Sequence, residues 1–231
     1  MDSTVPLHRH PAPHRELARR YRQYFWPEPL RSRAILALLL FLGSIFIVQP
    51  YAVQYATERA SSSVTDIVLS NIPIYDVDGA FVYGMFLLIA FIALLCVAHP
   101  KRIPFTLFSL TLFVLIRCAF VSLTHLAPFT PAPTDFGPAI SRAFFGSDLF
   151  FSGHTGAPFL MALIYWRDTL LRSIFLLWSV FFAAVVLLGH FHYSIDVASA
   201  YFITYGIFHI AKRIFPRDRA LFYADTPARS I

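Results

Sequence analysis

Charged residues are scarce in this chain. Asp, Glu, Lys and Arg make up 14% of its 231 residues, and hydrophobic residues make up 57%. A soluble globular domain carries about a quarter charged residues. Residues 80–98 contain no charged side chain at all. This shortage excludes an ordinary soluble domain and predicts a chain embedded in a membrane.

Cysteine is equally scarce. The two cysteines, Cys96 and Cys118, both fall within apolar runs. We therefore expect no disulfide between them, and they give no indication of the redox compartment.

Six apolar stretches are present, and each approaches the ~20 residues that cross a bilayer as a helix. The fourth and fifth are somewhat short. The first follows a polar leader and lacks a small-residue cleavage site, so we interpret it as an uncleaved span. The 25 Phe and 11 Tyr suit a lipid-embedded bundle with rings at the interfaces. We predict an all-α membrane protein, a six-transmembrane helix bundle with spans near residues 34–53, 80–98, 103–126, 150–166, 173–189 and 193–211.

The basic residues indicate how this bundle is oriented. Of the 19 Lys and Arg, 16 lie in the leader, the second and fourth connections and the tail. Arg59 and Arg142 lie on the opposite side, and Arg117 lies within a span. The positive-inside rule then predicts that both termini are cytoplasmic. The net charge of +6 is thereby explained by topology, with anionic-lipid contact as a secondary role and no nucleic-acid partner.

The predicted domain organisation follows from these spans. Residues 1–33 form a polar, basic cytoplasmic leader whose aromatic residues we place at the membrane interface. Residues 34–214 form the six-span domain, and residues 215–231 form a cytoplasmic tail. Two long outward connections, 54–79 and 127–149, contain proline, and long loops of this kind are often functional. The interfacial aromatics of the leader are Tyr21, Tyr24, Phe25 and Trp26.

Two polar segments stand at the outer ends of predicted spans. "GSDLFFSGHTGAPF" at residues 146–159 carries His154, and "GHFHYSIDVASAY" at residues 189–201 carries His192 and Asp196. The spacing of four between His192 and Asp196 predicts one side of a helix. Both spans enter from the outer face, so we expect the three side chains to lie at similar depth.

Such a set suits phosphoryl transfer. A nucleophilic imidazole needs one free nitrogen, and a carboxylate on the other nitrogen fixes the tautomer, which are the roles predicted for His192 and Asp196. A second imidazole, His154, can protonate the leaving alkoxide and later deprotonate the acceptor. Arg117 is costly inside an apolar run and could neutralise the phosphoryl oxygens, although it could also snorkel or pair with an acid.

Further residues complete the predicted site. Gly153 would let a phosphate approach the backbone closely. Asp148 is either a substrate-positioning acid or a hydrated interfacial residue. Zinc chelation by "HFH" with Asp196 is the metal-dependent alternative; we favour a site without metal or cofactor. The predicted substrate- and phosphate-binding residues are Arg117, Asp148, Ser152, Gly153 and Tyr193.

At these residues the chain resembles a known family. "GSDLFFSGHT" and "HYSIDVASAYFI" are similar to the two C-terminal motifs of the sphingomyelin synthase family, a branch of the type-2 phosphatidic acid phosphatase (PAP2) superfamily. "LIRCAFVSLTHLAPFTP" resembles its third-span motif, and "NIPIYD" is a looser match to its first-loop motif. Synthases usually show Cys-Gly-Asp before Ser-Gly-His, whereas here residues 146–148 retain only the final acid. We also expect no counterpart here of their soluble N-terminal extension.

The resemblance implies a catalytic set of His154, His192 and Asp196, a phosphohistidine on His192 and an extracytoplasmic site. We expect transfer of phosphocholine or phosphoethanolamine from a glycerophospholipid to ceramide or diacylglycerol, so membrane phospholipids and lipid alcohols are the partners. Two alternatives remain. A lipid phosphatase or phospholipase C-like hydrolase would use water as the acceptor, and a lipid transporter or scaffold would catalyse no reaction.

The expected location is a membrane with this site on its outer side. The compact length favours a bacterial inner membrane over a eukaryotic Golgi or plasma membrane. Whether the chain forms a homo-oligomer is left open by its sequence.

Overall fold

The computed structural model describes most of the predicted spans. Tyr24, Phe25, Trp26, Arg142 and Asp148, which the sequence singles out, lie outside the described residues. The described residues are 28–129 and 149–224, with residues 15, 18, 19, 21 and 22 of the leader.

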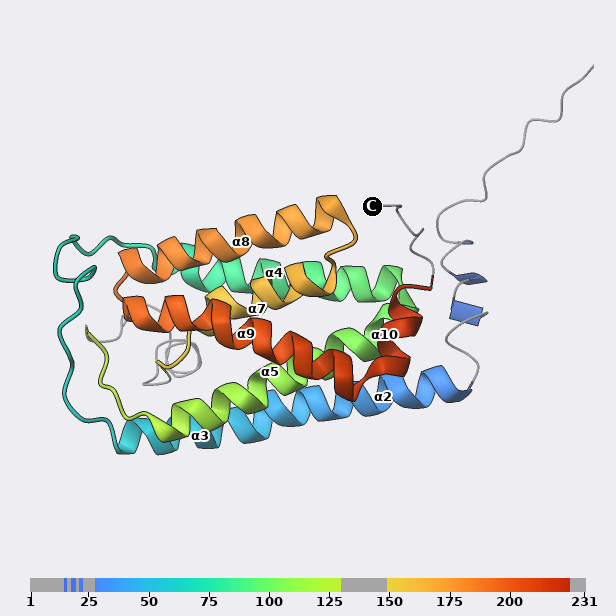
Figure 1. Ribbon diagram of the computed structural model, residues 1–231, viewed down its shortest axis with the longest axis horizontal. Coiled ribbons are helices and arrows are strands. Elements are labelled where there is room, and N and C mark those ends of the chain that lie inside the picture. Colours follow the sequence, from blue (N-terminus) through green and yellow to red (C-terminus); the bar gives the residue numbers. More distant parts are fainter. Residues whose placement is uncertain (1–14, 16–17, 20, 23–27, 130–148, 225–231) are drawn as a thin grey trace, which may run out of the picture.

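Throughout this described part the regular elements are helical, as predicted (Figure 1). A continuous first helix contains one π-helical segment, Ser44–Val48, and a short 3-10 turn, Pro100–Arg102, leads into another. The α-helices are α2 (Glu28–Gly43), α3 (Gln49–Glu58), α4 (Asp78–Ala98), α5 (Ile103–Leu123), α7 (Gly153–Ile164), α8 (Thr169–Leu188), α9 (Ser194–Ile214) and α10 (Pro216–Phe222).

Within the described part of the chain, four helical segments are long and apolar enough to cross a membrane, which indicates a multi-pass membrane protein. They are Glu28–Glu58, Asp78–Ala98, Pro100–Leu123 and Thr169–Leu188. The other two predicted spans differ from these. Helix α7 has 12 residues, fewer than a bilayer-spanning helix needs, and α9 has 21 residues but includes an acidic first turn and a basic last turn.

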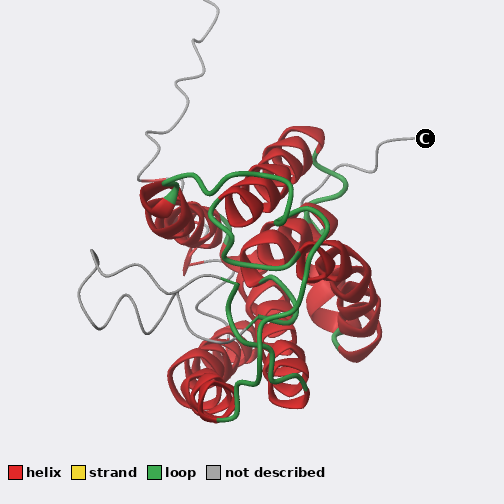
Figure 2. Cartoon of the chain, turned by 90° about the vertical axis from the view of Figure 1, so that its left-hand side faces the viewer, coloured by secondary structure: helices red, strands yellow, loops and turns green. Residues whose placement is uncertain are grey.

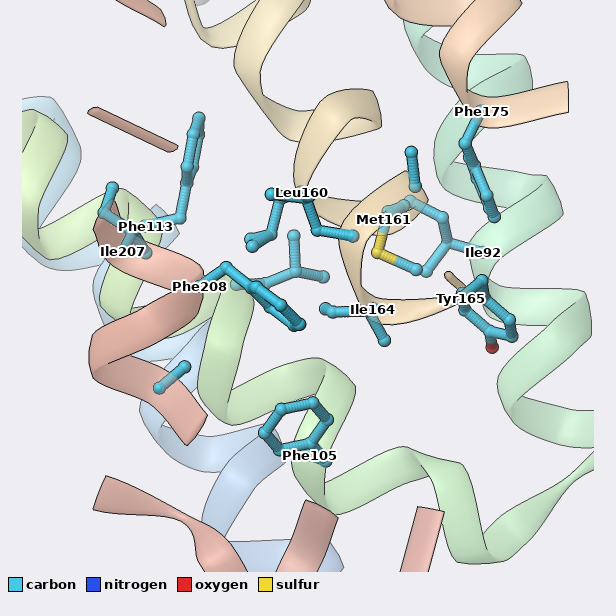
Figure 3. Packing of buried hydrophobic residues seen from close by; sticks show 14 of the residues in the cluster. Ile92, Phe105, Phe113, Leu160, Met161, Ile164, Tyr165, Phe175, Ile207 and Phe208 are labelled. Atoms are coloured by element: carbon cyan, nitrogen blue, oxygen red, sulfur yellow. The ribbon is translucent and has the colours of Figure 1, made fainter. Parts of the chain in front are cut away.

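Helix α7 lies inside the bundle. It packs most extensively against α8 and α9, and Figure 1 shows it between them. Leu160, Met161 and Ile164 of α7 are completely buried in the main hydrophobic core, where Phe105 of α5 and Phe175 of α8 join them (Figure 3). The outer helices instead expose large apolar side chains, as lipid contact requires.

The two ends of the bundle are closed differently. At one end, Arg33 of α2 forms an ion pair with the buried Asp218 of α10, and the Tyr223 hydroxyl donates to the Ile164 carbonyl at 2.7 Å. At the other end, the connecting loops cross the helix ends (Figure 2). There the loop after α3 packs through Leu69 against Tyr193, at the start of α9. This loop-covered end holds the candidate site.

Candidate active site

His154 lies in the first turn of α7. That helix starts at Gly153 because Ser152 caps it, accepting a hydrogen bond from the Thr155 N–H at 3.4 Å. Phe81 of α4 stacks on the His154 ring with the centroids 3.8 Å apart, and Phe182 of α8 meets it edge-on at 5.3 Å. Aromatic rings from two other helices therefore fix the orientation of this imidazole.

His192 lies in the turn between α8 and α9, so the prediction that it is part of a helix is wrong. The backbone N–H of Phe191 returns to the Val186 carbonyl at 2.9 Å, and His190 has a φ of 55°. A non-glycine residue in this left-handed region is uncommon, and it redirects the chain sharply. Helix α9 begins only at Ser194, two residues after His192.

The His192 ring nevertheless contacts Asp196. Its Nδ1 atom lies 3.4 Å from the Asp196 Oδ2 atom, and both side chains are buried. The same Oδ2 atom accepts the backbone N–H of Tyr193 at 3.0 Å, which caps the start of α9. Capping thus holds the carboxylate in place beside the imidazole, although among the described residues the His192 Nδ1 atom makes no hydrogen bond.

A backbone hydrogen bond joins the two histidine segments. The Ser152 N–H donates to the Asp196 carbonyl oxygen at 3.1 Å, so the starts of α7 and α9 lie side by side. His154 is within electrostatic range of both His192 and Arg117. The structure therefore brings the two imidazoles, the carboxylate and the guanidinium into one region.

Arg117 reaches this region from the C-terminal part of α5. Its side chain is buried, and its Nε atom donates to the Phe151 carbonyl oxygen at 2.9 Å. The guanidinium also lies against Gly153, where a Cβ atom would come within 3.1 Å of Nε. The arginine is thus placed at the N-terminus of α7, where a helix favours anions.

The remaining predicted site residues have varied positions. Ser152 is completely buried as the cap of α7. The Tyr193 hydroxyl donates to the Ala127 carbonyl at 2.8 Å and accepts from the Val64 N–H at 3.2 Å, so it joins loops at the loop-covered end of the bundle. Among the described residues, no three His, Cys, Asp or Glu side chains gather closely enough to hold a metal ion.

Sequence reasoning missed two residues around this region, Phe81 and Asp66. Phe81 covers His154, and Asp66 accepts hydrogen bonds from Ser194 at the start of α9. His190 is buried, and no described residue hydrogen-bonds either of its ring nitrogens. The "HFH" pattern had singled out His190 only as part of a possible zinc site, and no sequence signal pairs Asp66 with Ser194.

Comparison with known proteins identifies this part of the chain. Residues 146–213 match the family described as PAP2 superfamily C-terminal, a domain found in sphingomyelin synthase-like proteins. The match extends through α7 and α8 and covers nearly all of α9, so it includes His154, His192 and Asp196 but not Arg117. No curated protein and no solved structure matches the chain. The region that holds the two histidines is therefore similar to the PAP2 superfamily C-terminal domain.

Proposed function

We propose that this protein is an integral membrane lipid phosphotransferase of the sphingomyelin synthase type. It moves a phospho-head group, phosphocholine or phosphoethanolamine, from a glycerophospholipid to ceramide or diacylglycerol. The observation that carries this proposal is the buried contact of His192 Nδ1 with Asp196 Oδ2, held beside His154 and Arg117. The PAP2 superfamily domain supports it, since that superfamily modifies lipid phosphates.

In the first step, the Nε2 atom of His192 attacks the phosphorus of the donor lipid. A phosphorus–nitrogen bond forms and the bond from phosphorus to the diacylglycerol oxygen breaks. Asp196 keeps the proton on Nδ1 and stabilises the imidazolium that develops. His154 gives its proton to the departing alkoxide, so diacylglycerol leaves as the neutral alcohol.

In the second step, the hydroxyl oxygen of the acceptor lipid attacks the phosphohistidine. His154, now neutral, takes the hydroxyl proton, and the phosphorus–nitrogen bond breaks. The head group then leaves on the acceptor, and both histidines return to their starting protonation states. The same acid–base residue serves both steps because the second step is the chemical reverse of the first.

Arg117 and the N-terminus of α7 complete the proposed phosphate site. The guanidinium lies against the backbone of Gly153, where no side chain separates it from the first turn of the helix. Fixed cations and helix N-terminal N–H groups stabilise phosphoryl charge without reorganising during the reaction. This proposal includes the predicted role in binding substrate and phosphate for Ser152, Gly153, Tyr193 and Asp148.

The proposed topology keeps the six predicted spans and both cytoplasmic termini. Four spans are supported by their length and composition. Helices α7 and α9 would complete the six, because the bundle packs around them and they need less apolar surface than lipid-facing helices. The distribution of basic residues then orients the histidine end towards the extracytoplasmic side.

The surroundings of His154 favour a lipid alcohol over water as the acceptor. Phe81 and Phe182 pack on its ring, and His192 and Asp196 are also buried. Such an apolar environment limits the supply of water that would hydrolyse a phosphohistidine. A hydrolase would use the same residues, so the acceptor must be measured directly.

The test is a lipid transfer assay on the purified full-length protein in detergent. Fluorescent ceramide is incubated with phosphatidylcholine or phosphatidylethanolamine, and lipid products, free phosphate and free phosphocholine are followed together. We expect a new fluorescent phospholipid. Release of phosphate or phosphocholine alone would instead identify a hydrolase.

Two histidine variants make the test specific. His192→Ala is expected to abolish transfer. His209→Ala is the matched control, because His209 lies on α9 about 22 Å along the helix axis from Ser194 and packs against Tyr205. No turnover by the wild type across both donors, with His192→Ala behaving identically, would favour a transporter or scaffold and overturn the proposal.

A further inference from the structure

The loop between α3 and α4 is joined to the start of α9 through one carboxylate. Asp66 is buried, and its side chain accepts four hydrogen bonds from three residues. Its Oδ1 atom accepts the N–H groups of Val68 at 2.8 Å and Leu69 at 3.1 Å. Its Oδ2 atom accepts the N–H of Ser194 at 2.7 Å and the hydroxyl of Ser194 at 2.8 Å.

The two oxygens of Asp66 therefore have different partners. Oδ1 closes the local turn that follows Asp66, as aspartate commonly does in turns. Oδ2 reaches a residue 128 positions further along the chain. Local turn formation needs only Oδ1, so the second oxygen is available for the start of α9.

Ser194 is the first residue of α9, where backbone N–H groups have no partner within the helix. Asp66 satisfies the N–H of Ser194, and Asp196 satisfies that of the preceding Tyr193. The N-terminus of α9 thus has one carboxylate from its own first turn and one from the distant loop. The helix dipole also favours both negatively charged carboxylates at this end of α9.

The Tyr193 hydroxyl strengthens the same connection. It accepts the Val64 N–H, from the loop that carries Asp66, and donates to the Ala127 carbonyl after α5. Two consecutive residues, Tyr193 and Ser194, are thus fixed from outside α9. His192 immediately precedes them and Asp196 closely follows, so both ends of the His192–Asp196 contact depend on this attachment.

We propose that Asp66 is a positioning residue for the phosphotransfer suggested above, on which this inference rests. It acts through Ser194, keeping the start of α9 where Asp196 can orient the His192 imidazole. The contact is sensitive to such support, because Nδ1 and Oδ2 are 3.4 Å apart and a further displacement would separate them. Misplacement of about 1 Å at a reacting group can cost 100-fold in rate.

Asp66→Asn tests this role with little change in volume. The amide oxygen can still accept from Val68 and Leu69, but the amide NH2 then faces the Ser194 N–H, so two donors oppose each other. We expect kcat to fall about 10-fold or more with KM nearly unchanged, because positioning rather than lipid binding is lost. Ser194→Ala removes only the hydroxyl bond, so its kcat should fall less.

Asp76→Asn is the matched control. It removes one carboxylate from the same loop, and Asp76 is exposed. Its kcat should equal that of the wild type. Rates are compared per folded protein, measured by thermal unfolding of each purified variant, so that a loss of fold is not counted as a loss of positioning.

A second readout does not depend on turnover. Nitrogen-15 histidine NMR of the full-length protein in detergent reports which ring nitrogen of His192 carries the proton, with His192→Ala assigning the signal. We expect Asp66→Asn to shift the His192 Nδ1 signal and Asp76→Asn to leave it unchanged. An unchanged signal in Asp66→Asn would overturn this inference even if the wild type transferred head groups. If Asp66→Asn shifts the His192 signal but the wild type shows no turnover, only the proposed function is overturned.

Discussion

The guanidinium of Arg117 rests directly on the backbone of Gly153. A Cβ atom at Gly153 would lie 3.1 Å from the arginine Nε atom and 3.4 Å from its Cζ atom. The Nε atom also donates to the Phe151 carbonyl, two residues before. The hydrogen bond to Phe151 therefore holds the arginine against the start of α7, and the close approach is possible because Gly153 has no side chain.

Gly153→Ala should displace Arg117 and slow the reaction. The added methyl group is closer to Nε than almost any normal Cβ contact, so the guanidinium must move. Removing a fixed donor from a developing anion costs about 100-fold to 1,000-fold in kcat. We expect a smaller loss, about 10-fold, because the arginine is shifted and not removed. The measurement is kcat in the lipid transfer assay.

Gly206→Ala provides the control for that substitution. Gly206 lies on α9, and a Cβ atom there would meet nothing within 4 Å. It makes the same chemical change within a helix, but away from the arginine. If Gly153→Ala and Gly206→Ala have the same kcat as the wild type, the close fit between Arg117 and Gly153 has no part in turnover.

Asp196→Asn should remove most of the activity while the fold is kept. At this third position of α9, asparagine can still accept the Tyr193 N–H through its amide oxygen. The same oxygen then faces His192 Nδ1, but a neutral amide cannot stabilise a cationic His192 as a carboxylate does. In a serine protease the comparable change costs about 10⁴-fold in kcat, and we expect a loss of at least about 100-fold.

Trapping of labelled phosphate supplies the independent measurement for this variant. With a donor whose leaving group departs without a proton, such as p-nitrophenyl phosphorylcholine, only the second step needs His154. A His154→Ala background should then accumulate labelled phosphohistidine on His192, whereas Asp196→Asn should form little label. Equal labelling in the two backgrounds would mean that the carboxylate does not activate the nucleophile.

The helices could largely be predicted from the sequence, because a hydrophobic run is a local property. The stretch predicted at residues 80–98 is the helix Asp78–Ala98, and the stretch at 103–126 is Ile103–Leu123. Apolar composition did not distinguish lipid-facing spans from α7, which is buried by other helices. The lipid phase and the interior of the bundle both exclude water, so both favour the same apolar residue types.

The surroundings of the site were less predictable. A spacing of four suggested that His192 was helical, yet the left-handed His190 ends α8 in a turn and α9 begins later. Phe81 and Asp66 gave no signal, because each acts on a segment far along the chain. Stacking on His154 and hydrogen bonding to Ser194 arise only when the helices pack.

Gly156→Ala should destabilise the fold. A Cβ atom at this position of α7 would lie 2.8 Å from the Phe113 ring and 2.8 Å from the Thr204 hydroxyl oxygen, with no space to move into. Overpacking of a core costs about 1–3 kcal/mol, which outweighs the helix propensity gained, about 1 kcal/mol. Gly206→Ala has the propensity gain alone. Thermal unfolding in detergent should therefore give a lower midpoint for Gly156→Ala and an equal or higher one for Gly206→Ala. Equal midpoints for the two variants would contradict this packing.

Acid should weaken the fold through Asp66. Burial raises the pKa of its carboxyl group, but hydrogen bonds from Leu69, Ser194 and Val68 outweigh burial and leave the pKa below its ordinary value. Folding therefore favours the ionised carboxylate, whose contribution is complete above the ordinary aspartate pKa, about 3.9, and is lost as the pH falls through the lowered value. Thermal unfolding between pH 7 and pH 3 should show a wild-type advantage over Asp66→Asn that shrinks towards acid pH. Asp76→Asn, in contrast, should follow the wild type throughout. A constant difference between wild type and Asp66→Asn at every pH would mean that shape, and not the charge of Asp66, holds the loop to α9.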